Sequence, residues 1–194
     1  MLRIIAGRFR GRRLQTPSGP DTRPTADAMR ETVYNVLGDA VRAARVADLF
    51  AGSGSLGLEA LSRGARAVVF VEQAPAALAV LRDNIAALGA QGESRVVRAD
   101  AVGYLGGSAL EPFDVMLADP PYALGAEDGL LEAARDRVVP GGWLVLQHGK
   151  QWQAPAELPG WQRGRPRRFG DTTIEFFVRE EAGDGADGAL SGDV

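Results

Sequence analysis

Three glycines at a fixed spacing constrain this chain more than any other feature of its sequence. Gly52, Gly54 and Gly57 form a G-x-G-x-x-G pattern between a short apolar stretch, residues 45–50, and a predicted helix at 56–63. Glycines in such a turn allow a tight reversal and let a ligand approach the backbone without a Cβ in the way. The pattern predicts a strand–turn–helix unit that binds a cofactor.

Apolar stretches that suit strands and helices alternate through the rest of the chain. Strands are predicted at residues 45–50, 67–71, 94–99, 113–118, 143–147 and 172–179. Helices are predicted at residues 56–63, 75–88 and 130–138. Strands that alternate with helices indicate a mostly parallel sheet with helices on both faces, so the predicted fold class is α/β.

The sequence divides into three parts. Residues 1–16 are predicted to form two short strands around Gly7, and a loop rich in Pro, Gly and Ser then leads to a helix. Residues 1–40 are therefore expected to form a hairpin-and-helix extension, and residues 41–180 the α/β domain. Residues 181–194 offer little to bury, and we expect an acidic, disordered tail there.

The net charge of −3 conceals an uneven distribution of charge. The last fifteen residues carry five acids and no base, so the remainder holds 22 bases against 20 acids. Seven of the 21 arginines fall within the first thirty residues, and a second group consists of Arg163, Arg165, Arg167 and Arg168. Such basic patches favour a nucleic-acid partner. The arginines expected to contact RNA phosphates are Arg8, Arg10, Arg12, Arg13 and Arg23.

The composition also argues against several classes of protein. There are no cysteines, which excludes disulfides and thiolate metal sites, and no metal is expected. No apolar run approaches the ~20 residues of a membrane-spanning helix, and the first residues lack the apolar stretch of a secretory signal. We expect a cytoplasmic protein without a membrane partner, and we expect a monomer.

Acidic side chains follow successive strands of the predicted sheet. Glu72 ends the second strand 20 residues after Gly52, Asp100 ends the third, and Asp119 ends the fourth. Open α/β sheets bind ligands at this carboxyl edge. Glu72 can accept hydrogen bonds from ribose hydroxyls, and Asp100 can meet an adenine amine. Together they predict an adenosine-containing cofactor, although the glycine pattern alone does not choose between NAD and S-adenosylmethionine.

The segment Asp119-Pro120-Pro121-Tyr122 indicates the chemistry. An exocyclic amine on a nucleic-acid base is a poor nucleophile, because its lone pair is delocalised into the ring. The Asp119 carboxylate and the Pro120 carbonyl can accept its two N–H groups and align it for methyl transfer. Tyr122 offers a flat face for a base that has left its stack. We therefore assign catalytic functions to Asp119, Pro120 and Tyr122.

These motifs resemble the class I, Rossmann-like methyltransferases with an (Asp/Asn)-Pro-Pro-(Tyr/Phe) signature. More narrowly, the chain resembles the RsmD family, which methylates guanine N2 in bacterial 16S ribosomal RNA. The matching stretches are residues 3–7, 23–25, 30–32, 48–64, 119–122 and 169–172. The N-terminal stretches carry the narrower resemblance, because the glycine turn and the Pro-Pro motif occur throughout the superfamily.

The resemblance implies a seven-stranded, mostly parallel sheet whose last strand is antiparallel, and S-adenosylmethionine as cofactor. It implies that Asp119 and Tyr122 hold a guanine, and that 16S ribosomal RNA or the assembling small subunit is the partner. The residues expected at the cofactor are Asp48, Phe50, Gly52, Gly54, Glu72, Asp100 and Ala101. The chain departs from the family at Gln147 and His148, where an acidic residue is expected; His148 is expected to be structural.

Two other classes of function remain open on the residues alone. A nicotinamide-dependent oxidoreductase shares the glycine turn and Glu72, but it leaves the Asp119 segment unexplained and no Tyr-x-x-x-Lys pair is evident. A non-catalytic RNA-binding module explains the arginines but not the acids at the strand ends. Among methyltransferases, adenine N6, cytosine N4 and glutamine N5 suit the same chemistry, and the choice of guanine N2 depends on the resemblance.

Overall fold

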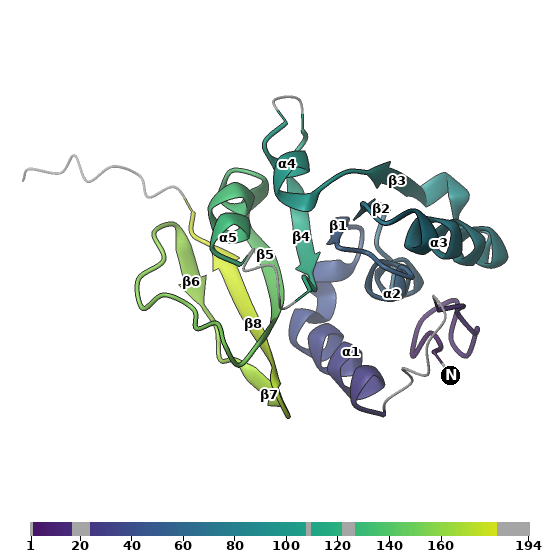
Figure 1. The fold of residues 1–194 in the computed structure, drawn as a ribbon, viewed down its shortest axis with the longest axis horizontal. Coiled ribbons are helices and arrows are strands. Elements are labelled where there is room, and N and C mark those ends of the chain that lie inside the picture. The colour runs from purple at the N-terminus through teal and green to yellow at the C-terminus, as the bar shows by residue number, and fades with distance from the viewer. Residues whose placement is uncertain (1, 17–23, 108–109, 122–126, 182–194) are drawn as a thin grey trace, which may run out of the picture.

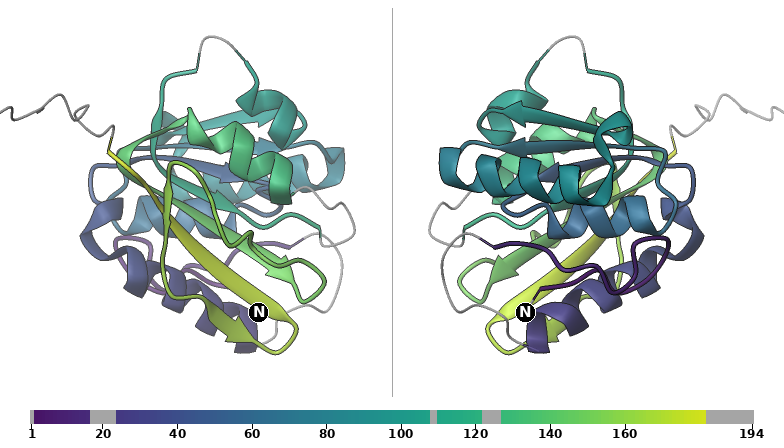
Figure 2. Two further views of the ribbon diagram at one scale, coloured as in Figure 1. Left: turned by 90° about the vertical axis from the view of Figure 1, so that its left-hand side faces the viewer. Right: turned by 90° about the vertical axis from the view of Figure 1, so that its right-hand side faces the viewer.

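The fold is a mixed sheet with helices on both faces, as Figures 1 and 2 show. The computed structural model describes residues 2–16, 24–107, 110–121 and 127–181. The strands are β1 Arg45–Leu49, β2 Ala67–Glu72, β3 Ser94–Arg98, β4 Phe113–Ala118, β5 Val138–Gly149, β6 Trp161–Arg163, β7 Arg167–Phe169 and β8 Thr172–Arg179. The α-helices are α1 Pro24–Leu37, α2 Ser55–Ser62, α3 Pro75–Leu88, α4 Ala101–Leu105 and α5 Glu127–Arg135, with short 3-10 turns at Gly38–Val41 and Gln91–Glu93.

The sheet has the strand order β3-β2-β1-β4-β5-β8-β6, and β7 also pairs with β8. Strands β1 to β5 are parallel, and β8 is antiparallel to β5. β6 and β7 both run antiparallel to β8 and pair with different halves of it. Pro166 lies between them and has no N–H to donate. They fill one edge position, so eight strands occupy the seven positions that were expected, and the mostly parallel α/β fold is confirmed.

Successive side chains of each strand point to opposite faces of the sheet, so the sheet has a separate hydrophobic core on each face. Val68 and Phe70 face the core that contains side chains from α1, α2 and α3, whereas Val69 and Val71 face the core that contains α4 and α5. Ile4 and Leu14 of the N-terminal segment are buried in the first core. No helix in the described part of the chain is long and apolar enough to cross a membrane.

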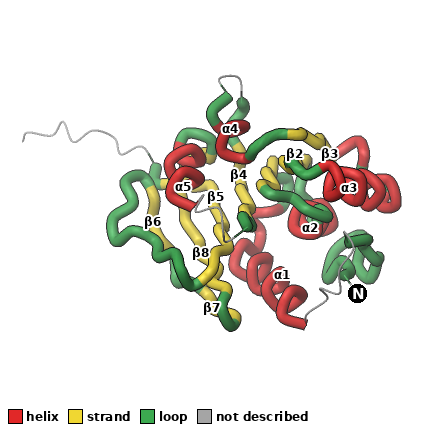
Figure 3. Tube along the Cα trace, in the orientation of Figure 1, coloured by secondary structure: helices red, strands yellow, loops and turns green. Residues whose placement is uncertain are grey.

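The N-terminal segment does not contain the two strands predicted for it. Figure 3 draws residues 2–16 as loop, and the segment has a single isolated bridge between Arg3 and Arg13. The segment still turns back on itself, because Ile4 N–H donates to the Arg12 carbonyl at 2.9 Å and Leu14 N–H donates to the Leu2 carbonyl at 3.0 Å, while α2 accepts other backbone donors. Ile5 N–H and Ala6 N–H donate to the buried Glu59 carboxylate at 2.7 and 3.0 Å, and Phe9 N–H donates to Ser62 Oγ at 2.9 Å.

Two further element boundaries differ from the prediction. α5 ends at Arg135 instead of residue 138, and β5 begins at Val138 instead of residue 143. Val138 pairs with Phe113, and the register then shifts so that Trp143 pairs with Val115. Val138 is therefore drawn into the sheet by a β-bulge that a periodicity argument does not detect.

Candidate functional site

The glycine turn follows β1 and opens α2, as predicted. Three of its residues have a positive φ: Phe50 at 61°, Gly52 at 56° and Gly54 at 82°. A Cβ on Gly54 would lie 2.4 Å from a side-chain carbon of Leu81, whereas a Cβ on Gly52 would meet only the Phe50 carbonyl oxygen at 3.9 Å. Packing therefore requires glycine at position 54, while the space beside Gly52 is open. The positive φ of Phe50 is backbone strain of the kind that clusters at binding sites.

Glu72 joins the end of β2 to this turn. Its Oε2 accepts a hydrogen bond from Gly52 N–H at 2.9 Å, and its Oε1 accepts from Gln73 N–H and Ala74 N–H at 2.8 Å each. The side chain is half-buried. Since each carboxylate oxygen has two lone pairs, Oε2 keeps capacity for a further donor.

Asp48 lies in β1 directly beneath the turn. Its side chain is buried, with 1% of the residue exposed, and its Oδ2 accepts a hydrogen bond from Gly57 N–H at 2.8 Å. Burial raises the pKa of Asp48 from 3.8 to about 8; the nearby charges of Asp119 and Glu72 raise this pKa further, and the Gly57 hydrogen bond opposes the rise. Asp48 thus supports the turn from below, and three carboxyl groups lie within electrostatic reach of one another.

Asp100 and Ala101 follow β3 at the same edge. Asp100 is exposed, and its Oδ2 accepts a hydrogen bond from Gly103 N–H at 2.7 Å, which caps the short helix α4. The Ala101 side chain is buried against the α4–α5 core, so only its backbone can face a ligand at this edge.

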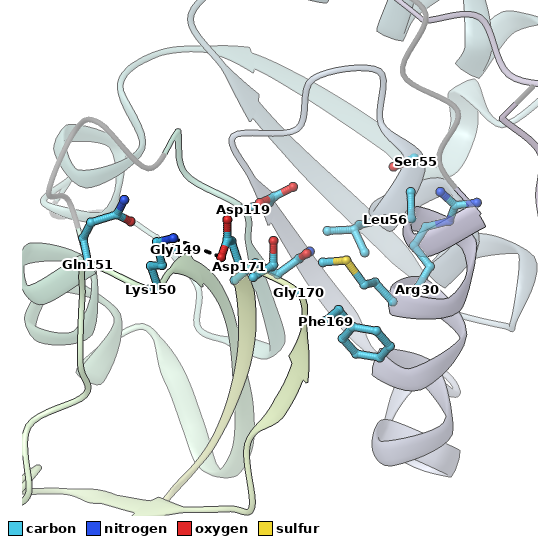
Figure 4. A pocket seen from close by; sticks show the side chains of 14 residues that line it. Arg30, Ser55, Leu56, Asp119, Gly149, Lys150, Gln151, Phe169, Gly170 and Asp171 are labelled. Carbon is cyan, nitrogen blue, oxygen red and sulfur yellow. Dashed lines mark hydrogen bonds and ion pairs between the residues drawn. The ribbon is translucent and has the colours of Figure 1, made fainter.

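Asp119 follows β4 and lines a cavity of about 680 Å³. Figure 4 shows its carboxylate between residues at the end of β5 and residues of α1 and α2. Asp119 is exposed to the cavity, but many protein atoms surround its carboxyl group, and the resulting desolvation raises the pKa of Asp119 from 3.8 to about 6. Pro120 is buried next to it. Tyr122, the third residue of the predicted catalytic group, lies outside the described residues.

The cavity, called the Asp119 cavity below, is assembled from segments far apart in the sequence. Its walls come from α1, the start of α2, the end of β4, the end of β5 and the turn between β7 and β8. Gln147 lines it, whereas His148, the next residue of β5, does not. Gly52, Glu72 and Asp100 are not among its walls.

Arg30 of α1 is a wall residue that the sequence reasoning did not select. Its guanidinium is buried, and one Nη donates to Asp27 Oδ1 at 2.7 Å and to the Arg3 carbonyl at 2.9 Å. Its Nε has no hydrogen-bond partner among the described residues. The available signal was its place in the stretch 30–32, which carries part of the family resemblance.

The predicted RNA-contact arginines fall into two groups in the structure. Arg8 forms an ion pair with Glu93, and Arg12 donates to the carbonyl oxygen of Ala87, so both are held against the protein. Arg10 and Arg13 are exposed and form no ion pair with any described residue. Arg23 lies outside the described residues.

Within the described ranges, no three Asp, Glu, His or Cys side chains are grouped so that they could hold a metal ion.

Comparison with known proteins gives the family of this chain. The sequence profile of the family described as Conserved hypothetical protein 95 matches residues 2–178. The chain is 35% identical over 189 residues to the ribosomal RNA small subunit methyltransferase D of Escherichia coli K12, covering 94% of this chain and 92% of that protein. It is 37% identical over 145 residues to the protein of the same name from Haemophilus influenzae, covering 74% of this chain and 73% of the relative.

A solved structure of the Escherichia coli protein yhhF superposes with a TM-score of 0.82 at 31% identity, covering 92% of this chain and 98% of that one. The Rossmann-like fold and the resemblance stated from the motifs are both confirmed. With a profile match over nearly its whole length, the chain belongs to the Conserved hypothetical protein 95 family, the family of the small subunit methyltransferase D proteins.

Proposed function

We propose that this protein is an S-adenosylmethionine-dependent methyltransferase that modifies the exocyclic N2 of a guanine in 16S ribosomal RNA. The observation that carries the proposal is Asp119, whose carboxylate lies in a cavity at the carboxyl edge of the sheet and is followed by the buried Pro120. The family supplies the substrate class, since relatives that cover most of this chain are named ribosomal RNA small subunit methyltransferases.

The residues at the edge of the sheet fit an adenosine-containing cofactor. Gly52 leaves open space on its Cβ side, and the Glu72 carboxylate beside it retains an acceptor position for a hydroxyl group. We propose that Glu72 holds the ribose and Asp100 the adenine, with the remainder of the cofactor along the glycine turn. S-adenosylmethionine, when bound, supplies a methyl group on a positively charged sulfur.

The carboxyl groups also favour this cofactor over a dinucleotide. Asp48, Glu72 and Asp119 lie close enough together that the latter two raise the pKa of the first. Because Asp48 keeps its proton at neutral pH, the negative charge comes from Glu72 and Asp119, and these two carboxylates attract a cation and repel the pyrophosphate of NAD. The oxidoreductase alternative therefore lacks support from the site as well as from the family.

Asp119 is suited to hold and deprotonate an amine. An ordinary aspartate is a weak base, whereas a carboxylate with a pKa of about 6 is still ionised at neutral pH and is a better proton acceptor. We propose that it accepts one N–H of the guanine amine while the Pro120 carbonyl accepts the other, so that the nitrogen lone pair is freed. The proton released on methylation then passes to Asp119.

The cavity is suited to a base removed from its stack. Its volume of about 680 Å³ falls in the range of small-ligand pockets, and α1 and the β7–β8 turn supply part of its walls. A base inside an RNA helix cannot reach Asp119, so the target nucleotide has to be turned outward or lie in an unpaired segment.

The test is single-turnover methylation of small-subunit particles from cells that lack the protein, with the modified nucleoside identified by mass spectrometry. The wild-type protein should produce N2-methylguanine, and Asp119→Ala should not within the same time. The matched control Asp83→Asn, an exposed carboxylate on α3, should behave as the wild type. N6-methyladenine as the product would overturn the assignment of guanine, and no methylated product from the wild type would overturn the function.

A further inference from the structure

A second cavity of about 480 Å³ lies beside the Asp119 cavity. It is called the Trp152 cavity here, and its walls include His148, Trp152, Arg163, Arg168 and Glu175. Lys150, Gly170 and Asp171 line both cavities. The two spaces are therefore neighbours that share part of their walls at the β7–β8 turn.

The cations of the Trp152 cavity differ in how they are held. Arg163 forms two hydrogen bonds with the buried Glu175 carboxylate, Nε to Oε2 at 2.9 Å and Nη2 to Oε1 at 2.6 Å, so its charge is matched inside the protein. Arg168 is exposed and has no ion pair with any residue that the structure describes, and the same holds for Arg165 just before β7. Arg168 in the cavity wall, and Arg165 three residues before it in the chain, thus remain available to an anionic partner.

Trp152 adds an aromatic wall that is already fixed in place. Its Nε1–H donates to Asp128 Oδ1 at 2.9 Å, and its ring meets the His148 ring edge-on at a centroid distance of 4.6 Å. His148 is itself buried, and its Nδ1 donates to the Gly149 carbonyl at 2.8 Å. A half-buried indole held in this way can stack a base without losing much side-chain freedom.

These features suit a nucleotide better than any smaller anion, because they combine a flat aromatic surface with unpaired guanidinium groups. We propose that the Trp152 cavity binds a nucleotide that flanks the target guanine in single-stranded RNA, with its base against Trp152 and its phosphate on Arg165 and Arg168. This inference rests on the proposed function. It extends the RNA path to the β6–β7 edge, which in Figure 1 lies apart from the N-terminal segment with α1 between them.

The first experiment measures the salt dependence of binding to a single-stranded RNA that spans the target. A lost phosphate contact should reduce the slope of log K against log salt by about 0.7, so Arg165→Gln with Arg168→Gln, which removes both partners of one phosphate, should reduce it by about 0.7. The matched control is Arg82→Gln with Arg95→Gln, two exposed arginines on α3 and β3 near the opposite edge of the sheet. An unchanged slope in the first pair, or an equal change in the control, overturns the inference.

The second experiment tests stacking at Trp152. Trp152→Leu should weaken RNA binding by about 5- to 150-fold, which corresponds to one lost base–aromatic contact. Trp152→Phe keeps an aromatic ring but loses the bond to Asp128, and it should retain most of the affinity. Equal losses in both variants would mean that the indole is only structural and would overturn its part in binding.

Two readouts separate this inference from the proposed function. Calorimetric binding of S-adenosylmethionine should be the same in all of these variants, because none of the substituted residues belongs to the glycine turn. If the wild type methylates guanine while the Arg165 and Arg168 variant keeps the wild-type salt slope, the inference fails and the function stands. If the wild type binds the RNA with the expected slope but forms no methylated base, the function fails.

Discussion

Asp48 should make the folding stability of this protein depend on pH in a way that one substitution can isolate. Its carboxyl group is buried beneath the glycine turn and has a pKa of about 8 in the folded protein, against 3.8 as the ordinary value. Below pH 3.8 the group is neutral in both states and costs nothing. As the pH rises from about 4 to 8, the unfolded chain loses this proton while the folded protein keeps it, so stability falls.

The size of the effect follows from the interval between the two pKa values. Each pH unit inside that interval costs about 1.4 kcal/mol, so roughly 4 kcal/mol is lost between pH 4 and pH 7. Asp48→Asn removes the titration while keeping an oxygen that can accept from Gly57 N–H. An unpaired amide N–H in the variant would add a constant cost, so the change of stability with pH is the quantity to test.

Urea unfolding at half-unit pH intervals from 4 to 9 would measure this difference. The stability of Asp48→Asn relative to the wild type should increase through pH 5, 6 and 7 and become constant above about 8. Asp83→Asn, at an exposed position, should show no such trend. A stability difference for Asp48→Asn that stays constant across this range would show that the buried carboxyl group does not keep its proton in the folded protein.

Three other outcomes are expected. Asp119→Ala should reduce single-turnover methylation by about 10²–10⁴-fold. The wild-type rate should increase about tenfold per pH unit up to pH 6. Asp119→Asn should lack this dependence on pH and should retain more activity than Asp119→Ala. Glu72→Ala should weaken binding of S-adenosylhomocysteine by ~1.5–3 kcal/mol in calorimetry, and unchanged affinity would exclude its proposed contact. Replacing Arg10 and Arg13 by Gln should flatten the salt dependence of RNA binding without altering cofactor affinity, and a slope equal to the wild type would mean that these arginines are only solvated.

The strands of the sheet were the most predictable part of the fold. Residues 113–118 and 172–179 coincide with β4 and β8, and the other parallel strands agree within about one residue at each end, apart from β5. These stretches are rich in β-branched and aromatic residues and are bounded by turn-forming sequence, so local preference and burial agree. The mostly parallel pairing was predicted from the alternation with helices, which leaves parallel pairing as the compact arrangement.

Elements whose structure depends on distant residues were not predictable in the same way. The N-terminal segment has one isolated bridge in place of two strands, and the N–H groups of Ile5 and Ala6 donate to Glu59, more than 50 residues away. β6 and β7 have three residues each and are mostly polar, so nothing in them indicates a strand until β8 is in place. Short edge strands of this kind are determined by their partner and not by their own composition.

The residues of the candidate site likewise divide into those that the sequence predicted and those that it did not. Asp119, Glu72 and the glycine turn were identifiable because each follows a predictable strand directly. Arg30 was not, because it reaches the Asp119 cavity through the packing of α1. Gln147 was placed at the end of its strand, but the sequence did not show that it lines the cavity. A sequence pattern can place residues at the end of a strand, but it cannot show which other segments enclose the space in front of them.

The interruption between β6 and β7 has a consequence for how this protein behaves at high concentration. A continuous, uncharged edge strand invites a strand of a second molecule to pair with it, and such pairing leads to aggregation. Here the edge is broken at Pro166, and arginines stand at 163, 165, 167 and 168, so an approaching copy meets both a missing donor and repulsion between like charges. Substitutions that probe these arginines should therefore keep polar side chains, because valine or isoleucine there would lengthen a sheet edge that the sequence keeps short.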